Sequence, residues 1–339
     1  MQPRNKLIVA WVLFLSVSLH VPAAEPEVSE KDLPRVPPTE PDKALATFQI
    51  KKGFRIELVA AEPLVVDPVC WNGGIFVGAT PDILYCKDTN GDGVADVREV
   101  VFTGIAGNYA PYDVNKLNVQ ALFNGFTWGL DNRIHAANGG DGGKVHLVDS
   151  EFTRAWQGRA GITPRSELRI PNSIDLRGHD FSFDPRTLMM HLESGGGQYG
   201  LSFDNRGRKF VCSNSAHIRE VMYEDRYAAR NPFFTLPAAA LDIAADGPAA
   251  EVYRISPDEP WRVIRTRWRV TGLFPGPIEG GGRPSGYFSG ATGITIYRGD
   301  AFPEDFRENA FVADCGSNHR TSVVIAGVDQ AASRFEQRQ

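Results

Sequence analysis

Short apolar runs, each closed by turn-forming residues, recur along most of this chain of 339 residues. From Phe48 onward the runs are four to seven residues long and are bounded by Gly, Asn, Asp or Pro. Runs of this length and spacing are typical of strands in an all-β domain. Ten of them are Arg55–Ala60, Gly74–Gly78, Ile83–Cys86, Glu99–Thr103, Lys144–Val148, Lys209–Cys212, Ala250–Ile255, Arg262–Thr266, Gly293–Tyr297 and Ala310–Ala313.

Helical periodicity is scarce in the chain, and the best window, Ile218–Ala229, is short. The arginines beside Trp261 and Trp268 are assigned to a solvated strand face, with stacking on the two indole rings as the alternative. These arginines are Arg262, Arg265, Arg267 and Arg269. Many short strands without crossover helices favour a sandwich, a barrel or a propeller.

Weak internal repetition favours the propeller among these folds. The segments Phe126–His135 and Leu201–Val211 each read as two strands joined by an Asp, Asn or Gly turn. Glu193–Gly197 and Glu279–Gly282 each join an acidic residue to three glycines ahead of a strand, as in a rim loop or an ordinary turn. We therefore predict an all-β fold, a β-propeller of the six-bladed type, with an incomplete set of blades as an open alternative.

The first residues have the three-part layout of a secretory signal. Basic residues precede the apolar run Leu7–Val21, and small residues follow it before Glu25. An uncleaved anchor is the alternative. We expect residues 1–23 to be the signal peptide, 24–45 an exposed lead-in rich in Pro and Glu, and 46–339 the propeller domain, truncated at its C-terminus. The protein is then exported, to the periplasm or outside the cell.

Charge and cysteine usage exclude several classes of protein. The formal net charge of −5 argues against a nucleic-acid partner. With no second apolar run long enough to span a bilayer, membrane association is at most peripheral or anchored. The four cysteines contain no C-x-x-C pair, so zinc-ribbon, thioredoxin-like and c-type haem motifs are absent from this sequence. Cys86 and Cys212 lie in apolar runs and are expected to be buried.

The sharpest local motif is the segment Asp88–Glu99. Oxygen-bearing side chains occupy positions 1, 3, 5, 9 and 12, with glycine at position 6, which is the EF-hand loop formula. The flanks look like strands, so we expect a structural calcium loop that closes a β-hairpin; an Asx-rich turn without metal is the alternative. The expected ligands are Asp88, Asn90, Asp92 and Asp96, with Glu99 as a further ligand or as a strand residue facing away.

Candidates for acid–base chemistry come from loops that carry histidine. Arg177, His179 and Asp180 lie together ahead of a strand, and His217 follows another. A histidine beside an aspartate can act as a general base, although neighbours on a strand point to opposite faces. We take these four as the candidate catalytic residues, with structural roles as the alternative; His319 is a further rim candidate. His135 and His146 alternate with apolar neighbours and are expected to be structural.

Several segments together resemble one known family. They are Phe54–Val65 with Asp67 and Pro68, Ala79–Tyr85 with the calcium-type loop, Trp128–Asn132, Glu193–Phe203, Glu224–Tyr227 with Ala229–Pro232, and Ala291–Gly299. They resemble the membrane-bound dehydrogenase domain of planctomycetes and verrucomicrobia, which is related to the glucose/sorbosone dehydrogenase propellers. The resemblance covers about residues 45–325. It implies a secreted β-propeller that oxidises a sugar or alcohol and passes electrons to a c-type haem domain or cytochrome.

The chain departs from that family at positions that should carry the chemistry. Ala121 stands where the distant quinone-dependent enzymes have a catalytic histidine, and Gly195–Leu201 lacks their Arg-Asn pair. Pyrroloquinoline quinone is therefore not supported as the cofactor. Arg283 and Gln198 are then the candidate cofactor-binding residues. The alternative is a shortened, non-catalytic propeller, stabilised by calcium, that binds carbohydrate or protein.

Overall fold

The computed structural model describes most of the predicted domain. The described ranges, apart from a few isolated residues outside them, are 39–48, 68–106, 119–140, 142–161, 173–224, 233–252, 257–315 and 322–327. The predicted signal peptide, most of the lead-in and His319 lie outside the described residues. Within these ranges no helix is both long enough and apolar enough to cross a membrane.

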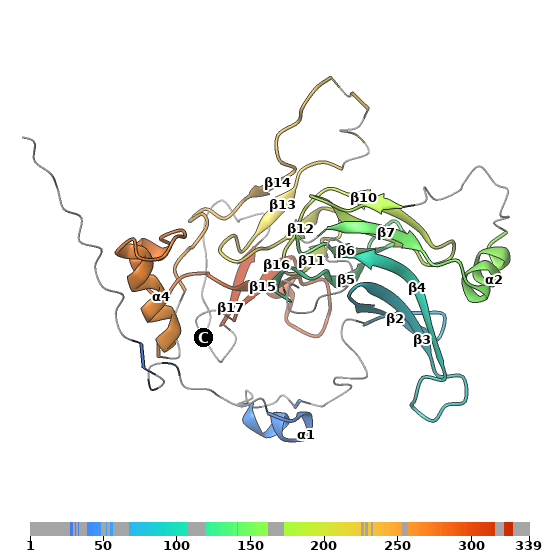
Figure 1. The fold of residues 1–339 in the computed structure, drawn as a ribbon, viewed down its shortest axis with the longest axis horizontal. Helices are drawn as coiled ribbons and strands as arrows, with labels where there is room; N and C mark the ends of the chain where they lie inside the picture. The colour runs from blue at the N-terminus through green and yellow to red at the C-terminus, as the bar shows by residue number, and fades with distance from the viewer. Residues whose placement is uncertain are drawn as a thin grey trace, which may run out of the picture.

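The described strands form four antiparallel sheets, of which the first two exchange strands along the chain and the last two follow in chain order (Figure 1). The first has the order β1-β2-β3-β4-β7-β8, made of Pro68–Trp71, Gly74–Ala79, Asp82–Lys87, Val97–Ile105, Gly143–Leu147 and Ile174–Asp175. The second has the order β10-β9-β6-β5, made of Met189–Glu193, Asp180–Asp184, Ile134–Ala137 and Asn124–Trp128.

The last two sheets are simple meanders. The third has the order β11-β12-β13-β14, made of Leu201–Phe203, Lys209–Val211, Arg219–Val221 and Ala240–Asp242. The fourth has the order β15-β16-β17, made of Ala291–Ile296, Asn309–Asp314 and Ser322–Gly327. The two hairpins expected around residues 126–135 and 201–211 are confirmed as β5-β6 and β11-β12.

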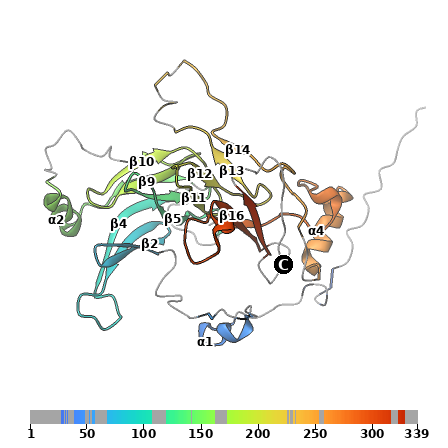
Figure 2. The ribbon, with the colours of Figure 1, turned by 180° about the vertical axis from the view of Figure 1, so that it is seen from behind.

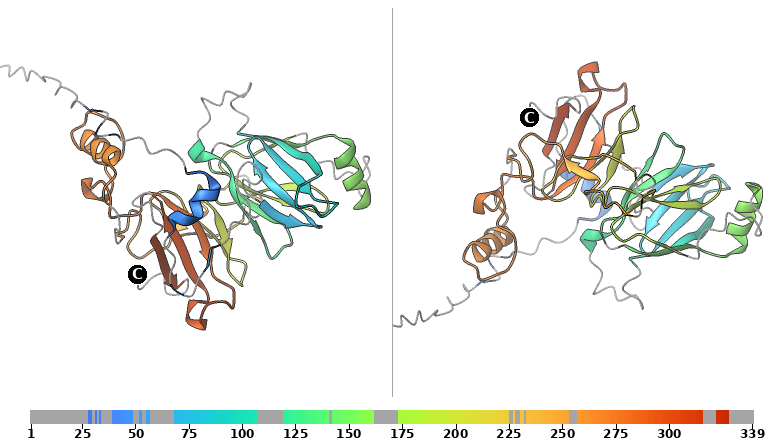
Figure 3. Two further views of the ribbon diagram at one scale, coloured as in Figure 1. Left: turned by 90° about the horizontal axis from the view of Figure 1, so that it is seen from below. Right: turned by 90° about the horizontal axis from the view of Figure 1, so that it is seen from above.

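The first strand of each sheet lies next to the first strand of the following sheet. β1 is beside β5, β5 beside β11, and β11 beside β15. Side chains join these strands, because Thr127 donates to the carbonyl of Leu201 at 3.3 Å and Ser202 accepts from the N–H of Ile296 at 2.9 Å. Blades whose first strands meet around an axis define a propeller. The all-β propeller prediction is confirmed, with four blades in the described part of the chain (Figure 3).

Apolar side chains fill the space between successive blades. Between the first two, Phe183 lies 5.0 Å from Phe76 and 5.4 Å from Phe102, measured between ring centroids. A smaller cluster that includes Leu201 lies between the second and third blades, and one that includes Phe288 lies between the third and fourth. Burial of aromatic and branched side chains between successive blades supplies the main stabilising term.

Two longer helices lie at opposite ends of the molecule, as Figure 2 shows from behind. α2, Glu151–Arg159, is inserted between β7 and β8 and begins with a capping box between Ser150 and Thr153. Its Trp156 packs edge-on against Tyr85 at 4.8 Å and donates to the carbonyl of Pro185 at 2.9 Å. α2 therefore closes the outer end of the first two blades.

α4, Pro260–Val270, lies between β14 and β15 and corrects one prediction. The expected strand Arg262–Thr266 is helical, because Pro260 starts the helix and Trp261, Ile264 and Trp268 follow at helical spacing. The window Ile218–Ala229, which has the best helical periodicity in the sequence, contains β13. The remaining short elements are α1 (Pro41–Ala44), η2 (Leu45–Thr47), η4 (Val119–Ala121), η5 (Gly280–Gly282) and η6 (Glu304–Phe306).

A buried ion pair joins the second and third blades. Asp180 begins β9 and is fully buried, and its Oδ2 lies 2.7 Å from Nζ of Lys209, which begins β12. The other carboxylate oxygen accepts from the N–H groups of Asn138 and Gly197, both at 3.1 Å. Lys209 also donates to the carbonyl of Ser194 at 2.8 Å. Both charges are thus paired and hydrogen-bonded, which is the condition for burying them.

We predict that Lys209→Met destabilises the protein strongly. It leaves the Asp180 carboxylate buried without its cation, and breaking such a pair costs about 3–5 kcal/mol. The measurement is the free energy of unfolding from urea denaturation. The matched control is Arg154→Gln, which breaks the exposed pair with Asp149 and should cost about 0–1 kcal/mol. Equal losses in the two variants would contradict the role assigned to Lys209.

Candidate functional site

A cleft of about 1580 Å³ lies between the second and third blades. Its walls come from β10, from β13 and the segment after it, and from the two hairpin turns that follow β5 and β11. Ser173 and β8, the last strand of the first sheet, close one side. The cleft combines charged groups with exposed apolar side chains.

The turn after β5 places a carboxylate against a histidine. Asn132 takes a left-handed backbone conformation, φ 61°, and the chain reverses so that both carboxylate oxygens of Asp131 lie 3.1 Å from Nε2 of His135. Burial acts to raise the pKa of Asp131, but the hydrogen bond and charge of His135 outweigh it and bring that pKa to about 2. The carboxylate is therefore ionised at neutral pH.

His135 itself is held inside the blade. It is 5% exposed, its ring lies edge-on to Phe203 at 4.9 Å, and its Nδ1 is buried without a hydrogen-bond partner among the described residues. The expectation that His135 is structural fits this burial. A reacting group on a substrate would need direct contact with a ring nitrogen, which this position does not offer.

Arg133 ties the cleft floor to β9 and β10. Its guanidinium donates to the hydroxyl of Ser182 at 2.7 Å and to the carbonyl of Met189 at 2.9 Å. Ser182 in turn donates to Glu193 at 2.5 Å. Burial lowers the pKa of Arg133, while Glu193 and Asp131 act to raise it. The charged groups of the floor therefore form one connected network that fixes the edge strand β10.

The walls of the cleft carry many apolar side chains. Every methionine of the chain after Met1 lines it, namely Met189, Met190 and Met222. Leu192, Met222 and Tyr227 are 37%, 54% and 51% exposed, respectively. Unbranched methionine side chains adapt to differently shaped partners and gather at binding surfaces. These residues are separated in sequence, so no motif marked them in advance.

The predicted catalytic residues are only partly brought together. Arg177 is exposed and paired with Asp175 at 2.9 Å, and His179 is half-buried on the same loop. Asp180 points into the protein, where it binds Lys209. His217 belongs to the loop before β13 in the next blade. Whether these four residues act in catalysis stays a prediction.

His217 is buried against an aromatic ring. Its ring stacks on Phe288 at 4.2 Å, and burial lowers its pKa to about 4, only partly opposed by a backbone hydrogen bond at Ser215. The imidazole is therefore neutral at pH 7. Its Nε2 lies 3.9 Å from Asp246, and with a neutral ring this contact is not an ion pair. Burial raises the pKa of Asp246.

The predicted cofactor contacts are engaged within the protein. Arg283 pairs with Glu251 at 3.0 Å and donates to the carbonyl of Gly280 at 2.9 Å. Gln198 donates to the hydroxyl of Tyr199 at 3.1 Å and, at 3.4 Å, to the carbonyl of Gln120. Ala121 is buried and brings no imidazole to this rim. That pyrroloquinoline quinone is not the cofactor stays a prediction.

The calcium-type loop closes the β3-β4 hairpin, so the strand flanks are confirmed. Asp88 accepts hydrogen bonds from the N–H groups of Asn90, Gly91 and Gly93, and those from Gly93 and Gly91 lower its pKa most. Asp96 accepts from Thr89. Across the described residues no group of three His, Cys, Asp or Glu side chains is placed to hold a metal ion. Calcium binding stays a prediction.

Comparison with known proteins places the chain in a family. A family model described as "Domain of unknown function (DUF7133)" matches residues 69–339. No curated protein matches the chain. Among solved structures, a luciferin-regenerating enzyme is similar at 10% sequence identity with a TM-score of 0.33. That match covers 76% of this chain and 56% of the other.

We predict that stability falls as the pH drops from about 6.5 to about 4, in part because of His217. The unfolded chain takes up a proton at the ordinary histidine pKa of 6.5, whereas the folded pKa is about 4. The stabilising contribution is thus complete above pH 6.5 and is lost through this window, about 3 kcal/mol in all. His217→Gln should flatten the profile of unfolding free energy against pH. His146→Gln, at an exposed site, should not, and identical profiles for the two variants would refute the assignment.

Proposed function

The chain belongs to the DUF7133 family, and we propose that it is an exported β-propeller that binds an extended polypeptide in the cleft between its second and third blades. The observation that carries the proposal is the lining of that cleft. All methionines after Met1 and several exposed apolar side chains gather there, on a floor of connected charges. Apolar surface of this kind on a soluble domain marks a site of interaction.

The size of the cleft favours an extended ligand. Pockets for small molecules usually measure about 300–1,000 Å³, and this cleft is about 1580 Å³. A sugar or alcohol monomer would leave most of the apolar wall in water. A peptide of several residues would cover it, with the apolar wall supplying affinity and the charged floor supplying orientation.

β10 gives such a peptide a backbone to bind. It is the terminal strand of the second sheet, so one row of its N–H and C=O groups points away from β9. An extended peptide can add to a sheet edge, with alternate side chains entering pockets beside it. Five successive residues of β10, from Met189 to Glu193, line the cleft, so a peptide bound there would run beside this strand.

A dehydrogenase is the second candidate. It is favoured by the convergence of Asp131, Arg133 and His135 at the cleft floor, together with the family resemblance. In that case the substrate is a sugar or alcohol, and electrons pass to a separate c-type haem protein. The burial of His135 and the poor fit to the quinone make this candidate the weaker one.

The Asp88–Glu99 loop would then hold calcium as a structural clip under either function. Three oxygen-bearing side chains, Asp88, Asn90 and Asp92, alternate along the tight turn as a hard cation requires. The ion would replace the loop N–H groups that now contact the carboxylates. It would also offset the repulsion among them.

We predict that calcium raises the thermal midpoint of the chain relative to chelator, because a ligand of the folded state stabilises by mass action. The measurement is thermal unfolding of residues 24–339. Asp88→Asn with Asp92→Asn should abolish the rise, and Asp149→Asn should keep it. Pyrroloquinoline quinone should add nothing. A further rise with the quinone, followed by dye-linked oxidation of a sugar, would overturn the order of the two candidate functions.

We also predict that the chain selects peptides from a random displayed library and that the cleft holds them. Leu192→Arg and Met222→Arg should weaken binding of a selected peptide about tenfold or more, as expected for exposed anchors in an interface. Val94→Arg is the matched control, since Val94 is also an exposed apolar residue but lies on the β3-β4 loop. Binding that is equal in all variants would refute the site. Selection of oligosaccharides but no peptides would overturn the ligand class.

A further inference from the structure

α4 carries three arginines at helical spacing on one side. Arg262, Arg265 and Arg269 follow at intervals of three and four residues, which brings their side chains to one face. Arg262 is buried and satisfied, because it bonds Glu259 at 2.6 Å and the hydroxyl of Ser289 at 2.9 Å. It anchors the helix to the residues before β15. The other two arginines, Arg265 and Arg269, have no such carboxylate partner among the described residues.

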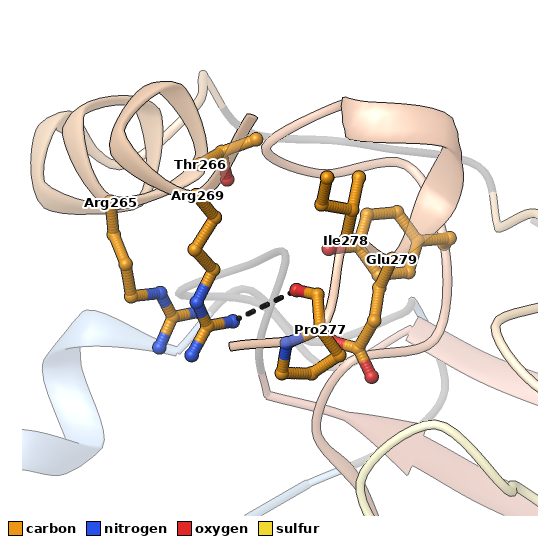
Figure 4. Close-up of a pocket in the computed structure, with 7 residues that line it drawn as sticks. Arg265, Thr266, Arg269, Pro277, Ile278 and Glu279 are labelled. Carbon is orange, nitrogen blue, oxygen red and sulfur yellow. Dashed lines mark hydrogen bonds between the residues drawn. The ribbon is translucent and has the colours of Figure 1, made fainter. Parts of the chain in front are cut away.

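Arg265 and Arg269 extend together into a small hollow between α4 and the segment Pro277–Glu279 (Figure 4). Both side chains leave the same face of α4, and both line this hollow. Among the described residues neither guanidinium has a carboxylate within ion-pair distance. Arg269 reaches only the carbonyl of Pro277, at 3.5 Å, and its Nε is buried without a partner in the same described set. Two partly buried cations thus share a site without a counter-charge in contact.

The two side chains are also held in place. The Arg265 guanidinium lies over the ring of Trp261 at 4.6 Å. Arg269 lies against Gly276, whose φ of 149° favours glycine and where a Cβ would meet Nε of the arginine. A preformed pair of guanidinium groups loses less conformational entropy on binding than two free surface arginines.

Like charges in this hollow oppose each other. Burial lowers the pKa of Arg265, and Arg269 and Arg262 lower it further, while Tyr287 and Glu279 act against them. Glu279 lines the hollow but is not close enough to pair with either cation. An anion seated between the guanidinium groups would relieve this repulsion.

We propose that Arg265 and Arg269 form a binding site for a doubly charged oxyanion, a phosphate or sulfate group. Two planar forks can each donate two N–H groups to a tetrahedral anion, and two negative charges match the two cations. The enclosed space, about 10 Å³, is about that of one water. One face of the anion therefore enters the hollow. The rest of the anion stays outside, together with any molecule to which it is attached. The site is at the end of the molecule away from α2 and is independent of the cleft.

The experiment is calorimetric titration of residues 24–339 with inorganic phosphate and, separately, with sulfate, at constant ionic strength in chloride. We expect binding by the native chain and at least a tenfold weaker affinity for Arg265→Gln and for Arg269→Gln. Arg267→Gln, on the same helix but exposed, should bind as the native chain does. Glu279→Gln removes a competing negative charge and should bind more tightly.

Circular dichroism and thermal unfolding in chloride show that each variant is folded before its titration is interpreted. No heat of binding with either anion, or the same affinity in Arg265→Gln, Arg269→Gln and Arg267→Gln, would overturn the site. Acetate binding as tightly as phosphate would overturn the assignment to a doubly charged group. Phosphate binding with no response to sulfate, or the reverse, would support the site and identify which of the two groups it takes.

Discussion

The pairing of Asp180 with Lys209 is the constraint on which the arrangement of the second and third blades depends. A charge buried between two sheets must find its partners there, and Asp180 finds them on three separate segments, at Lys209, Asn138 and Gly197. The loop after β10 covers the pair. Glycine is required at position 195 because a side chain there would clash with the carboxylate of Asp180. Burial in a low-dielectric interior makes such a contact specific as well as strong. The contact between Asp180 and Lys209 therefore also sets the distance between the walls of the cleft.

Strand periodicity predicted most of the fold because strand formation here is local. The hairpins of residues 126–135 and 201–211 carry their turn residues between two short apolar runs, and no distant contact is needed to recognise them. α4 was missed because Val263 and Ile264, which favour strands, stand in its middle. The spacing of Trp261, Ile264 and Trp268 was the signal that could have identified the helix. α2 was not predicted either, and its capping residues Ser150 and Thr153 were the signal that could have identified it.

The cleft was much less predictable than the blades. Its methionines come from β10 and from the residue that follows β13, and only the packing of two blades brings Met189 and Met222 to one hollow. Asp131 and His135 lay in a hairpin that the sequence identified, but their pairing depends on the left-handed turn at Asn132. Conversely, Arg177, His179 and Asp180 are neighbours in sequence and still differ in burial, because the first two lie on the loop before β9, whereas Asp180 begins the strand and is enclosed between two blades.

Apolar and cationic surfaces are separated in this propeller. Two cations of the cleft are paired within the protein, Arg208 with Asp204 and Lys209 with Asp180, and most of the exposed lining is apolar. On α4 the opposite holds, since Arg262 is neutralised by Glu259 while Arg265 and Arg269 are not. A ligand of the cleft gains from leaving water, and binding there should depend weakly on salt. Binding of a ligand to α4 depends on the attraction between opposite charges, which salt screens over about 10 Å at 0.1 M. Salt dependence therefore separates the two surfaces even before either ligand is known.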